Sequence, residues 1–292
     1  MKTHLKFAGA LLLISALNPS FSTASGATTI DPLNKYAWAV NLGWMDWRSD
    51  TANGAVIGDY VCSGYLYAAN VGWLNLGSGS PTNGIHYQNL SASDFGVNQD
   101  GLGNLRGYAY GANIGWVNFE NSGAPKVDLR TGKFSGYAYS ANCGWISLSN
   151  TSAFVQTDSF DPGALAPDGL PIAWLLICFG TTNVNANADA DGDGMSNRQE
   201  YLAGTDPTNP NDKLQITAFS TLPGGTLATL SWQSTPTRFY YLQKTLDLAQ
   251  PVWADSGLGL IAPDGASTTR SFSDTNAPLR FYRVRAIRPL SP

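Results

Sequence analysis

Ionisable side chains are scarce in this chain of 292 residues. Charged residues make up 13% of the sequence, the formal net charge is −4, and there are only two Glu and two His. A nucleic-acid-binding surface needs a basic stripe, so this composition argues against that class of partner. No stretch after the N-terminal leader reaches about 18 consecutive apolar residues, so the sequence predicts no membrane-spanning helix.

Recognisable catalytic patterns are missing as well. Apart from His4 in the leader, His86 is the only histidine, so a Ser/His/Asp or Cys/His set would depend on it alone. Glu120 and the scattered Asp residues form no evident glycosidase pair, although residues distant in sequence can pair in space. Phosphate-binding loops, dinucleotide fingerprints and zinc spacings are absent too. We therefore predict a non-enzymatic protein, and keep a hydrolase with an unrecognised site as an alternative.

Cysteine is also rare, and its three positions are Cys62, Cys143 and Cys178. An odd number leaves at least one thiol unpaired within the chain. The sequence allows either one disulfide in an oxidising compartment or buried thiols that pack as small apolar side chains.

The N-terminus predicts secretion. A short basic start precedes an apolar run over residues 7–17, and small residues then offer a cleavage site after Ala24 or Ala27. This order is typical of a signal peptide, here residues 1–27. The rest of the chain is rich in Gly, Asn, Thr, Ser and Trp, which suits an extracellular β protein with many turns.

Residues 36–150 contain an internal repeat. An Asn-x-Gly-Trp core occurs four times, at spacings of 29, 43 and 29 residues, and its Trp residues are Trp44, Trp73, Trp116 and Trp145. Residue alternation on both sides of each core predicts strand, tight turn, strand. The turn glycines, which we expect at positive φ, are Gly43, Gly72, Gly115 and Gly144. Four copies could form a solenoid, a closed barrel or a propeller-like ring, and the sequence does not choose between these.

The repeated Tyr and Trp residues have two interpretations. Identical spacing in every copy is what packing a repeat requires, so we expect the rings to form the core between strands. Alternatively, exposed rings would form a platform for a cell-surface or extracellular polysaccharide. Solvent exposure of the four repeat Trp side chains discriminates between the two. The repeat resembles one of secreted and surface proteins of environmental bacteria, a resemblance that implies no particular chemistry.

The acidic residues concentrate in one stretch, residues 189–200, which fits the calcium-loop pattern D-x-[DN]-x-[DN]-G-x₅-E without a gap. Four of the 21 acidic residues lie there, and carboxylates this close repel one another unless a cation lies between them. Calcium takes about six to eight oxygen ligands, and Gly194 allows the turn around it. The expected ligands are Asp189, Asp191, Asp193, the carbonyl of Met195, Asn197 directly or through water, and Glu200.

A wider stretch carries a specific resemblance. The Asp-Gly-Leu-Pro motif at residues 168–171, the Phe-Gly pair at 179–180, the acidic loop and residues 200–207 resemble the bacterial thrombospondin type 3-like repeat over residues 168–212. The resemblance implies a secreted, calcium-binding multidomain protein. Its implied ligands are Asp189, Asp191, Asp193, Asn197 and Glu200. Paired EF-hands usually have a β-branched or apolar residue at loop position 8, which links two loops, whereas position 8 here is Ser196. No second full loop is present, so we expect a single site without a sensor role.

Turn and cap signals predict the remaining elements. Residues 152–168 are polar and punctuated by Pro and Gly, which predicts a linker, and residues 172–179 and 198–203 predict short helices. The C-terminal part predicts a β-sandwich of about seven strands, like a fibronectin type III or Ig-like module. Its alternating runs are residues 214–219, 227–232, 239–244, 269–272 and 281–287.

The predicted architecture is therefore mainly β. It consists of a signal peptide (1–27), an antiparallel β repeat module (28–151), a linker with a short helical calcium-binding joint (152–212) and a β-sandwich (213–292). We expect the ion to be structural and its effect on stability to be local to the joint, because each β module has its own core.

Overall fold

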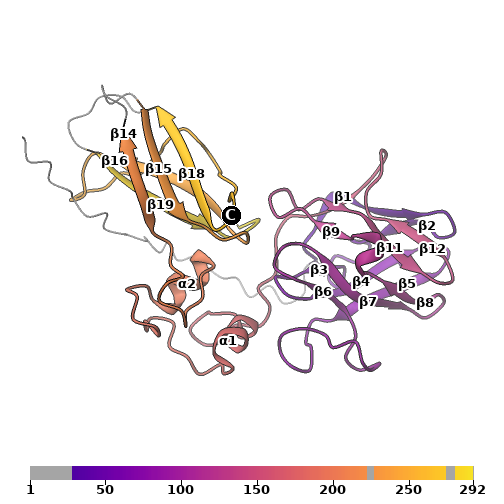
Figure 1. Ribbon diagram of the computed structural model, residues 1–292. Helices are drawn as coiled ribbons and strands as arrows, with labels where there is room; N and C mark the ends of the chain where they lie inside the picture. The colour runs from indigo at the N-terminus through magenta and orange to yellow at the C-terminus, as the bar shows by residue number, and fades with distance from the viewer. Residues whose placement is uncertain (1–27, 222–226, 274–279, 292) are drawn as a thin grey trace, which may run out of the picture. The chain divides into compact units, whose positions relative to one another are not determined.

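The computed structural model describes residues 28–221, 227–273 and 280–291, so the predicted signal peptide lies outside the described residues. Antiparallel strands dominate the described chain (Figure 1), which confirms the predicted mainly-β fold class. None of the helices among the described residues is long and apolar enough to cross a bilayer.

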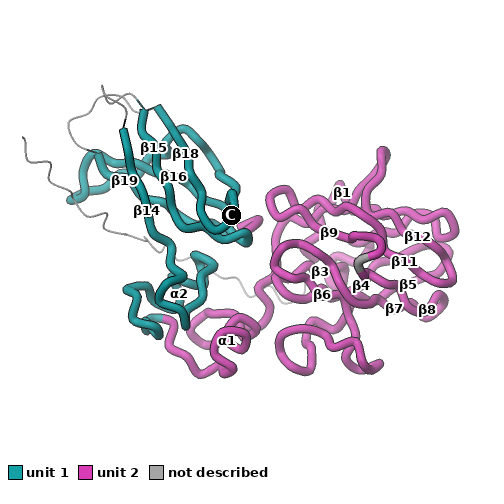
Figure 2. Tube along the Cα trace, in the orientation of Figure 1, with its two compact units in different colours: residues 1–19, 187–288 teal, residues 20–186, 289–292 magenta. Residues whose placement is uncertain are grey.

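The described residues divide into two compact units (Figure 2). In chain order, the first unit, magenta in Figure 2, holds residues 28–186 together with residues 289–291, and the second, teal in Figure 2, holds residues 187–288. The first contains the repeats and helix α1 (Ile172–Phe179), and the second contains helix α2 (Asn197–Ala203) and the C-terminal strands. Both helices lie where the sequence predicted them, and each ends at a glycine in the left-handed conformation, Gly180 and Gly204.

The repeats form a closed eight-stranded barrel of four hairpins, one hairpin per repeat. Each strand pairs antiparallel with the next, and the last strand returns to pair with the first at Ser147 and Trp38. A closed barrel leaves no unpaired edge, and it excludes the solenoid and propeller-like alternatives. The barrel strands are β1 (Ile30–Ala39), β2 (Gly43–Asp46), β4 (Cys62–Ala68), β5 (Gly72–Ser78), β7 (Leu105–Gly111), β8 (Gly115–Asn118), β11 (Tyr137–Ser140) and β12 (Gly144–Ser147).

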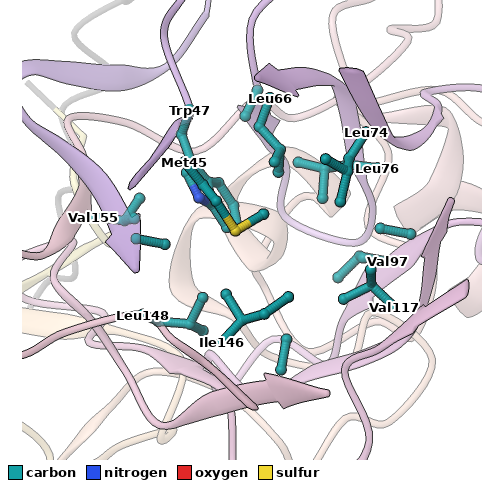
Figure 3. Packing of buried hydrophobic residues seen from close by; sticks show 14 of the residues in the cluster. Met45, Trp47, Leu66, Leu74, Leu76, Val97, Val117, Ile146, Leu148 and Val155 are labelled. Carbon is teal, nitrogen blue, oxygen red and sulfur yellow. The ribbon is translucent and has the colours of Figure 1, made fainter. Parts of the chain in front are cut away.

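Alanine and aliphatic side chains fill the barrel interior. Each hairpin places alanine or leucine before its turn and an aliphatic residue after it on the inner face, and Figure 3 shows Met45, Leu66, Leu74 and Ile146 among these side chains. Successive side chains of a strand alternate between the two faces of the sheet. The intervening Tyr and Trp positions therefore face outward.

The expectation that the repeated rings form the core is wrong. Trp44, Trp73, Trp116 and Trp145 are 49%, 47%, 45% and 49% exposed. An eight-stranded barrel is only just wide enough for side chains to fill, so small and aliphatic residues fit inside it and rows of indoles do not. Trp47, which lies outside the repeat core, is buried instead, with its ring 5.3 Å from that of Phe134.

Four asparagine side chains tie the hairpin turns together at one end of the barrel. Each Asn of an Asn-x-Gly turn donates its side-chain N–H to the backbone carbonyl of residue x in a neighbouring turn. The four bonds run from Asn41 to Cys143 (3.1 Å), from Asn70 to Leu42 (3.2 Å), from Asn113 to Val71 (3.0 Å) and from Asn142 to Ile114 (3.0 Å). Each turn both donates and accepts one bond, so the ring of bonds closes on itself. We call this set the asparagine ring.

The turn glycines confirm the sequence prediction. Their φ angles are 73° at Gly43, 81° at Gly72, 72° at Gly115 and 80° at Gly144. Only glycine adopts this left-handed conformation routinely, because it has no Cβ. The turns therefore place the residues of the asparagine ring in equivalent positions.

Further short elements surround the barrel. They are β3 (Val56–Ile57), β6 (Val97–Gln99), the 3-10 turn Asn121–Gly123, β9 (Lys126–Val127), β10 (Phe134–Ser135) and β13 (Val155–Thr157). Strand β13 pairs with β1, and Asp161 bridges to Gly58, so residues predicted as a linker pack on the barrel. Their Pro and Gly residues mark turns between these contacts.

Two of the three cysteines are buried thiols of the first unit, which we call the barrel unit because it contains the barrel. Cys62 and Cys143 are 1% and 7% exposed and are not bridged. Burial raises the pKa of the Cys62 thiol to about 12. These two residues therefore follow the packed-thiol alternative, and Cys178 lies on α1.

The second unit contains two three-stranded antiparallel sheets. One consists of β14 (Ile216–Thr221), β15 (Leu227–Gln233) and β18 (Ser267–Ser273), and the other of β17 (Ala254–Asp255), β16 (Phe239–Thr245) and β19 (Phe281–Ile287). Side chains of both sheets share one core, in which the rings of Trp232 and Tyr240 lie 5.9 Å apart. All five predicted runs are strands. Two-residue β17 gave no alternating signal, and with the five predicted runs it brings the strands of this unit among the described residues to six, against about seven expected.

The left-handed turn conformation predicts the effect of Gly115→Val. Valine has room at this position, since an added Cβ would meet Asn142 Nδ2 at 3.8 Å, but it is strained at φ 72°. We expect the barrel to lose more than about 1 kcal/mol of stability. Denaturant unfolding measures the loss, with Ala112→Val, an exposed change in the same turn, as the control. An unchanged unfolding curve for Gly115→Val would contradict the strain.

The asparagine ring predicts the effect of Asn113→Asp. The Nδ2 group of Asn113 donates to the Val71 carbonyl at 3.0 Å. Aspartate places a carboxylate oxygen there instead, so two hydrogen-bond acceptors face each other. We expect a loss of about 1 kcal/mol of barrel stability, the usual net contribution of one hydrogen bond. Thermal unfolding compares this variant with Asn183→Asp, which makes the same change at an exposed position of the same unit. Equal melting temperatures of the two variants would show that the ring contributes nothing.

Candidate metal centre

The acidic loop, residues 189–200, lies entirely in the second unit and runs into helix α2. Gly192 and Gly194 adopt φ of 80° and 97°, so the loop turns at two positions where a residue with a side chain would have a strained backbone. Ser196 then caps α2: its side chain accepts the backbone N–H of Gln199, whose side chain accepts the N–H of Ser196. The position that departs from the paired EF-hand pattern is thus the start signal of the helix.

Backbone N–H groups hold the three aspartates in place. One carboxylate oxygen from each of Asp189, Asp191 and Asp193 lies within 4.8 Å of the other two. Gly194 donates its N–H to Asp189 Oδ2 at 2.9 Å. Asp193 donates to Asp191 Oδ1 at 3.1 Å, and Met195 donates to Asp193 Oδ1 at 2.7 Å. Asp191 and Asp193 are each anchored through Oδ1, which leaves Oδ2 for another partner.

Four buried carboxylate oxygens of this loop have no hydrogen-bond partner among the described residues. They are Asp191 Oδ2, Asp193 Oδ2 and both oxygens of Glu200. Glu200 itself is 0% exposed. Buried polar groups are nearly always paired, and an unpaired buried carboxylate is costly, so these four oxygens need a compensating positive group.

The electrostatics of the loop point the same way. Burial, together with the nearby charges of Asp191, Asp193 and Asp189, raises the pKa of Glu200 to about 8. Burial also raises the pKa of Asp191. The pKa of Asp189 is lowered instead, because the backbone N–H of Gly194 stabilises its charged form. A site without a cation therefore disfavours full ionisation of its own carboxylates.

The donor set fits a hard divalent cation. Carboxylate oxygens are the preferred ligands of calcium, and the structure brings the three aspartates together and couples Glu200 to them. Asn197 is fully buried, and its backbone N–H donates to the Ala188 carbonyl at 2.8 Å, which joins the two ends of the loop. Met195 is 3% exposed. All six predicted ligand residues thus belong to one compact loop.

The loop is anchored in the core of the second unit. The side chains of Met195 and Ala203 belong to the same hydrophobic cluster as Trp232 and Tyr240. Arg238 adds a polar tie, because its Nε donates to the Leu202 carbonyl at 2.9 Å. No motif in the sequence predicts this anchoring. The one signal for it was an apolar residue, Met195, in an otherwise polar loop.

The other residues considered for chemistry have structural contacts. Glu120 Oε1 accepts the backbone N–H of Gly107 at 2.8 Å. His86 lies with its ring 6.0 Å from that of Tyr60, and burial lowers its pKa. Both residues therefore help to position loops of the barrel unit.

Comparison with protein families matches one segment of the chain. Residues 189–210 match the family described as bacterial TSP3 repeat, which agrees with the resemblance seen in the sequence and covers its acidic part. Comparisons with curated proteins and with solved structures give no match. The acidic loop of the second unit is thus similar to a bacterial thrombospondin type 3 repeat.

Proposed function

We propose that this chain is a secreted, non-enzymatic protein whose second unit binds one calcium ion in a structural role. The observation that carries the proposal is that four buried carboxylate oxygens of one loop, from Asp191, Asp193 and Glu200, have no hydrogen-bond partner among the described residues. The expected ligands are Asp189, Asp191, Asp193, Met195, Asn197 and Glu200. The match to the bacterial TSP3 repeat supports the choice of calcium, and the N-terminal sequence supports secretion.

The ion would act on more than the loop. Bound calcium supplies the positive charge that offsets repulsion among the carboxylates, so Glu200 can stay ionised while buried. Met195 lies inside the loop and also packs in the core of the second unit. Ordering the loop therefore fixes one wall of that core. This anchoring replaces the sequence-based expectation of a purely local effect with one on the whole second unit.

Calcium should stabilise the second unit and leave the barrel unchanged. We expect calorimetric titration to give one site with a dissociation constant of about 10⁻⁴ to 10⁻³ M. Binding to the folded state alone adds up to about 2.7 kcal/mol at a hundredfold excess over that constant. Chelation should therefore lower the melting temperature of one transition, and Gly115→Val, which shifts only the barrel, identifies the other transition.

Asp191→Asn provides the matched test of the ligand assignment. Asparagine keeps the Oδ1 acceptor that holds the Asp193 N–H and replaces Oδ2, the proposed ligand atom, with an amide nitrogen. The variant should lose the calcium-dependent shift. Asp247→Asn makes the same change at an exposed turn of this unit and should keep it. No calorimetric signal at tenfold above about 10⁻³ M calcium, with identical melting curves, would falsify the assignment.

We also propose a second function, the binding of polysaccharide by the aromatic outer wall of the barrel. The observation that favours it is the exposure of the four repeat Trp side chains, each between 45% and 49%. Each lies beside tyrosine rings, such as Tyr67 at 5.0 Å from Trp73 and Tyr139 at 5.0 Å from Trp145. Exposed aromatic faces with polar edges are suited to ligands that are apolar on one side and wet on the other.

The exposed position of Trp116 predicts that Trp116→Ala folds and loses polysaccharide binding. Retention on insoluble cellulose and on insoluble chitin measures binding, and thermal unfolding measures the fold. Trp47→Ala is the control, because Trp47 is 2% exposed and its loss should cost about 3 to 5 kcal/mol. Unfolding of Trp116→Ala to a similar extent would return the repeat Trp residues to a packing role.

A further inference from the structure

The strand registers arrange the outer wall of the barrel into four equivalent rows. Each row crosses the four strands of two neighbouring hairpins. The first hairpin contributes a Tyr and, on its second strand, the polar residue paired with that Tyr. The next hairpin contributes an aromatic residue and, on its second strand, the Trp paired with that aromatic residue. We name each row by its polar residue. The rows are Tyr36–Asp46–Tyr67–Trp73, Tyr65–Asn75–Tyr110–Trp116, Tyr108–Asn118–Tyr139–Trp145 and Tyr137–Ser147–Trp38–Trp44.

The polar residues of two rows already have their side chains engaged. In the Asp46 row, the carboxylate pairs with Lys35 at 2.8 Å and accepts the backbone N–H of Arg48. In the Ser147 row, the hydroxyl donates to the Ser149 carbonyl at 2.8 Å. Neither row offers a spare hydrogen-bond donor at its centre.

The two asparagine rows do offer such a donor. Asn75 Oδ1 accepts the N–H of Gly77 at 2.8 Å, and Asn118 Oδ1 accepts the N–H of Glu120 at 2.5 Å. These bonds fix the orientation of each amide. The Nδ2 atoms of both residues have no hydrogen-bond partner among the described residues, so each has N–H groups available between two aromatic neighbours.

The Asn75 row has an additional side wall. Phe95, from the segment between β5 and β6, places its ring 6.2 Å from that of Tyr110 and 5.1 Å from that of Trp116. Among the described residues, the ring contacts of Trp44, Trp73 and Trp145 are with tyrosines, so Trp116 alone of the four repeat Trp residues has a phenylalanine beside it. Tyr65, Tyr110 and Trp116 remain 41%, 39% and 45% exposed beside it.

We propose that the Asn75 row, with Phe95, is the subsite that binds pyranose residues of a neutral polysaccharide. This inference rests on the polysaccharide-binding function proposed above and locates it. A pyranose ring has an apolar C–H face and hydroxyl groups at its edge, which match aromatic rings on either side of an amide donor. The row carries no Lys, Arg, Asp or Glu, so it suits an uncharged ligand. Acyl chains would leave the Asn75 donor unpaired at a desolvation cost.

The dimensions of the row suit an oligosaccharide segment. Tyr65 and Trp116 are separated by three strand-to-strand steps, and each step is about 4.8 Å. The row is therefore about 14 Å long, which accommodates a few consecutive sugars along a polymer. Phe95 stands beside one end of it.

Asn75→Asp and Asn118→Asp form a matched pair that tests the assignment. Aspartate keeps the Oδ1 acceptor and replaces the Nδ2 donor, and Asp46 shows that the barrel accommodates aspartate at the equivalent position. Adsorption isotherms on insoluble cellulose and on insoluble chitin would be measured with the full chain. We expect Asn75→Asp and Phe95→Ala each to weaken binding about tenfold, and Asn118→Asp to change it by less than about twofold.

The outcomes separate this inference from the function on which it rests. Loss of binding in Asn118→Asp but not in Asn75→Asp, or equal binding by both variants, would overturn the Asn75 row and leave the polysaccharide function standing. A wild-type chain that is retained on neither polymer would overturn that function and this subsite with it. Thermal unfolding of each variant, compared with wild type, shows that a loss of binding is not a loss of fold.

Discussion

The barrel depends on a hydrogen bond that is made four times, from the side-chain amide of each turn asparagine to the carbonyl of a neighbouring turn. A hairpin by itself is marginally stable, and the repeat gains stability only when its neighbours are fixed beside it. The asparagine ring fixes them at the turn end, and the pairing of β12 with β1 closes the sheet. The glycine two residues after each asparagine supplies the left-handed backbone on which this geometry depends.

Closure of the barrel decides which side chains face the solvent. The narrow interior takes alanine and aliphatic residues, so the tyrosines and tryptophans of every repeat are left on the outer face. The same alternation places one polar residue among the rings of each row. Four copies with one geometry then differ in their polar residue and in the neighbouring Phe95, so the Asn75 row has surroundings that the other three rows lack.

The second unit joins an acidic loop to a β core. Met195 and Ala203 belong to the core, whereas the carboxylates of Asp189, Asp191 and Asp193 accept backbone N–H groups of the loop itself. The buried oxygens of Glu200 lie where the loop enters helix α2. Because one short segment serves both the acidic cluster and the core, a cation bound by the cluster would be coupled to the stability of the whole unit.

The sequence by itself determined the strand-turn-strand repeats, the turn glycines, both helices, the C-terminal strands and the acidic loop, because each of these depends on local periodicity or on a motif. It could not determine closure of the barrel, because the pairing of Ser147 with Trp38 joins residues at opposite ends of the repeat array. Closure in turn placed the rings outside, opposite to what the repeat spacing favoured. The anchoring of the acidic loop by Arg238 and the packing of Phe95 on Trp116 also depend on contacts distant in sequence. Only the tertiary structure decided these features, because alternation assigns residues to two faces without saying which face is buried.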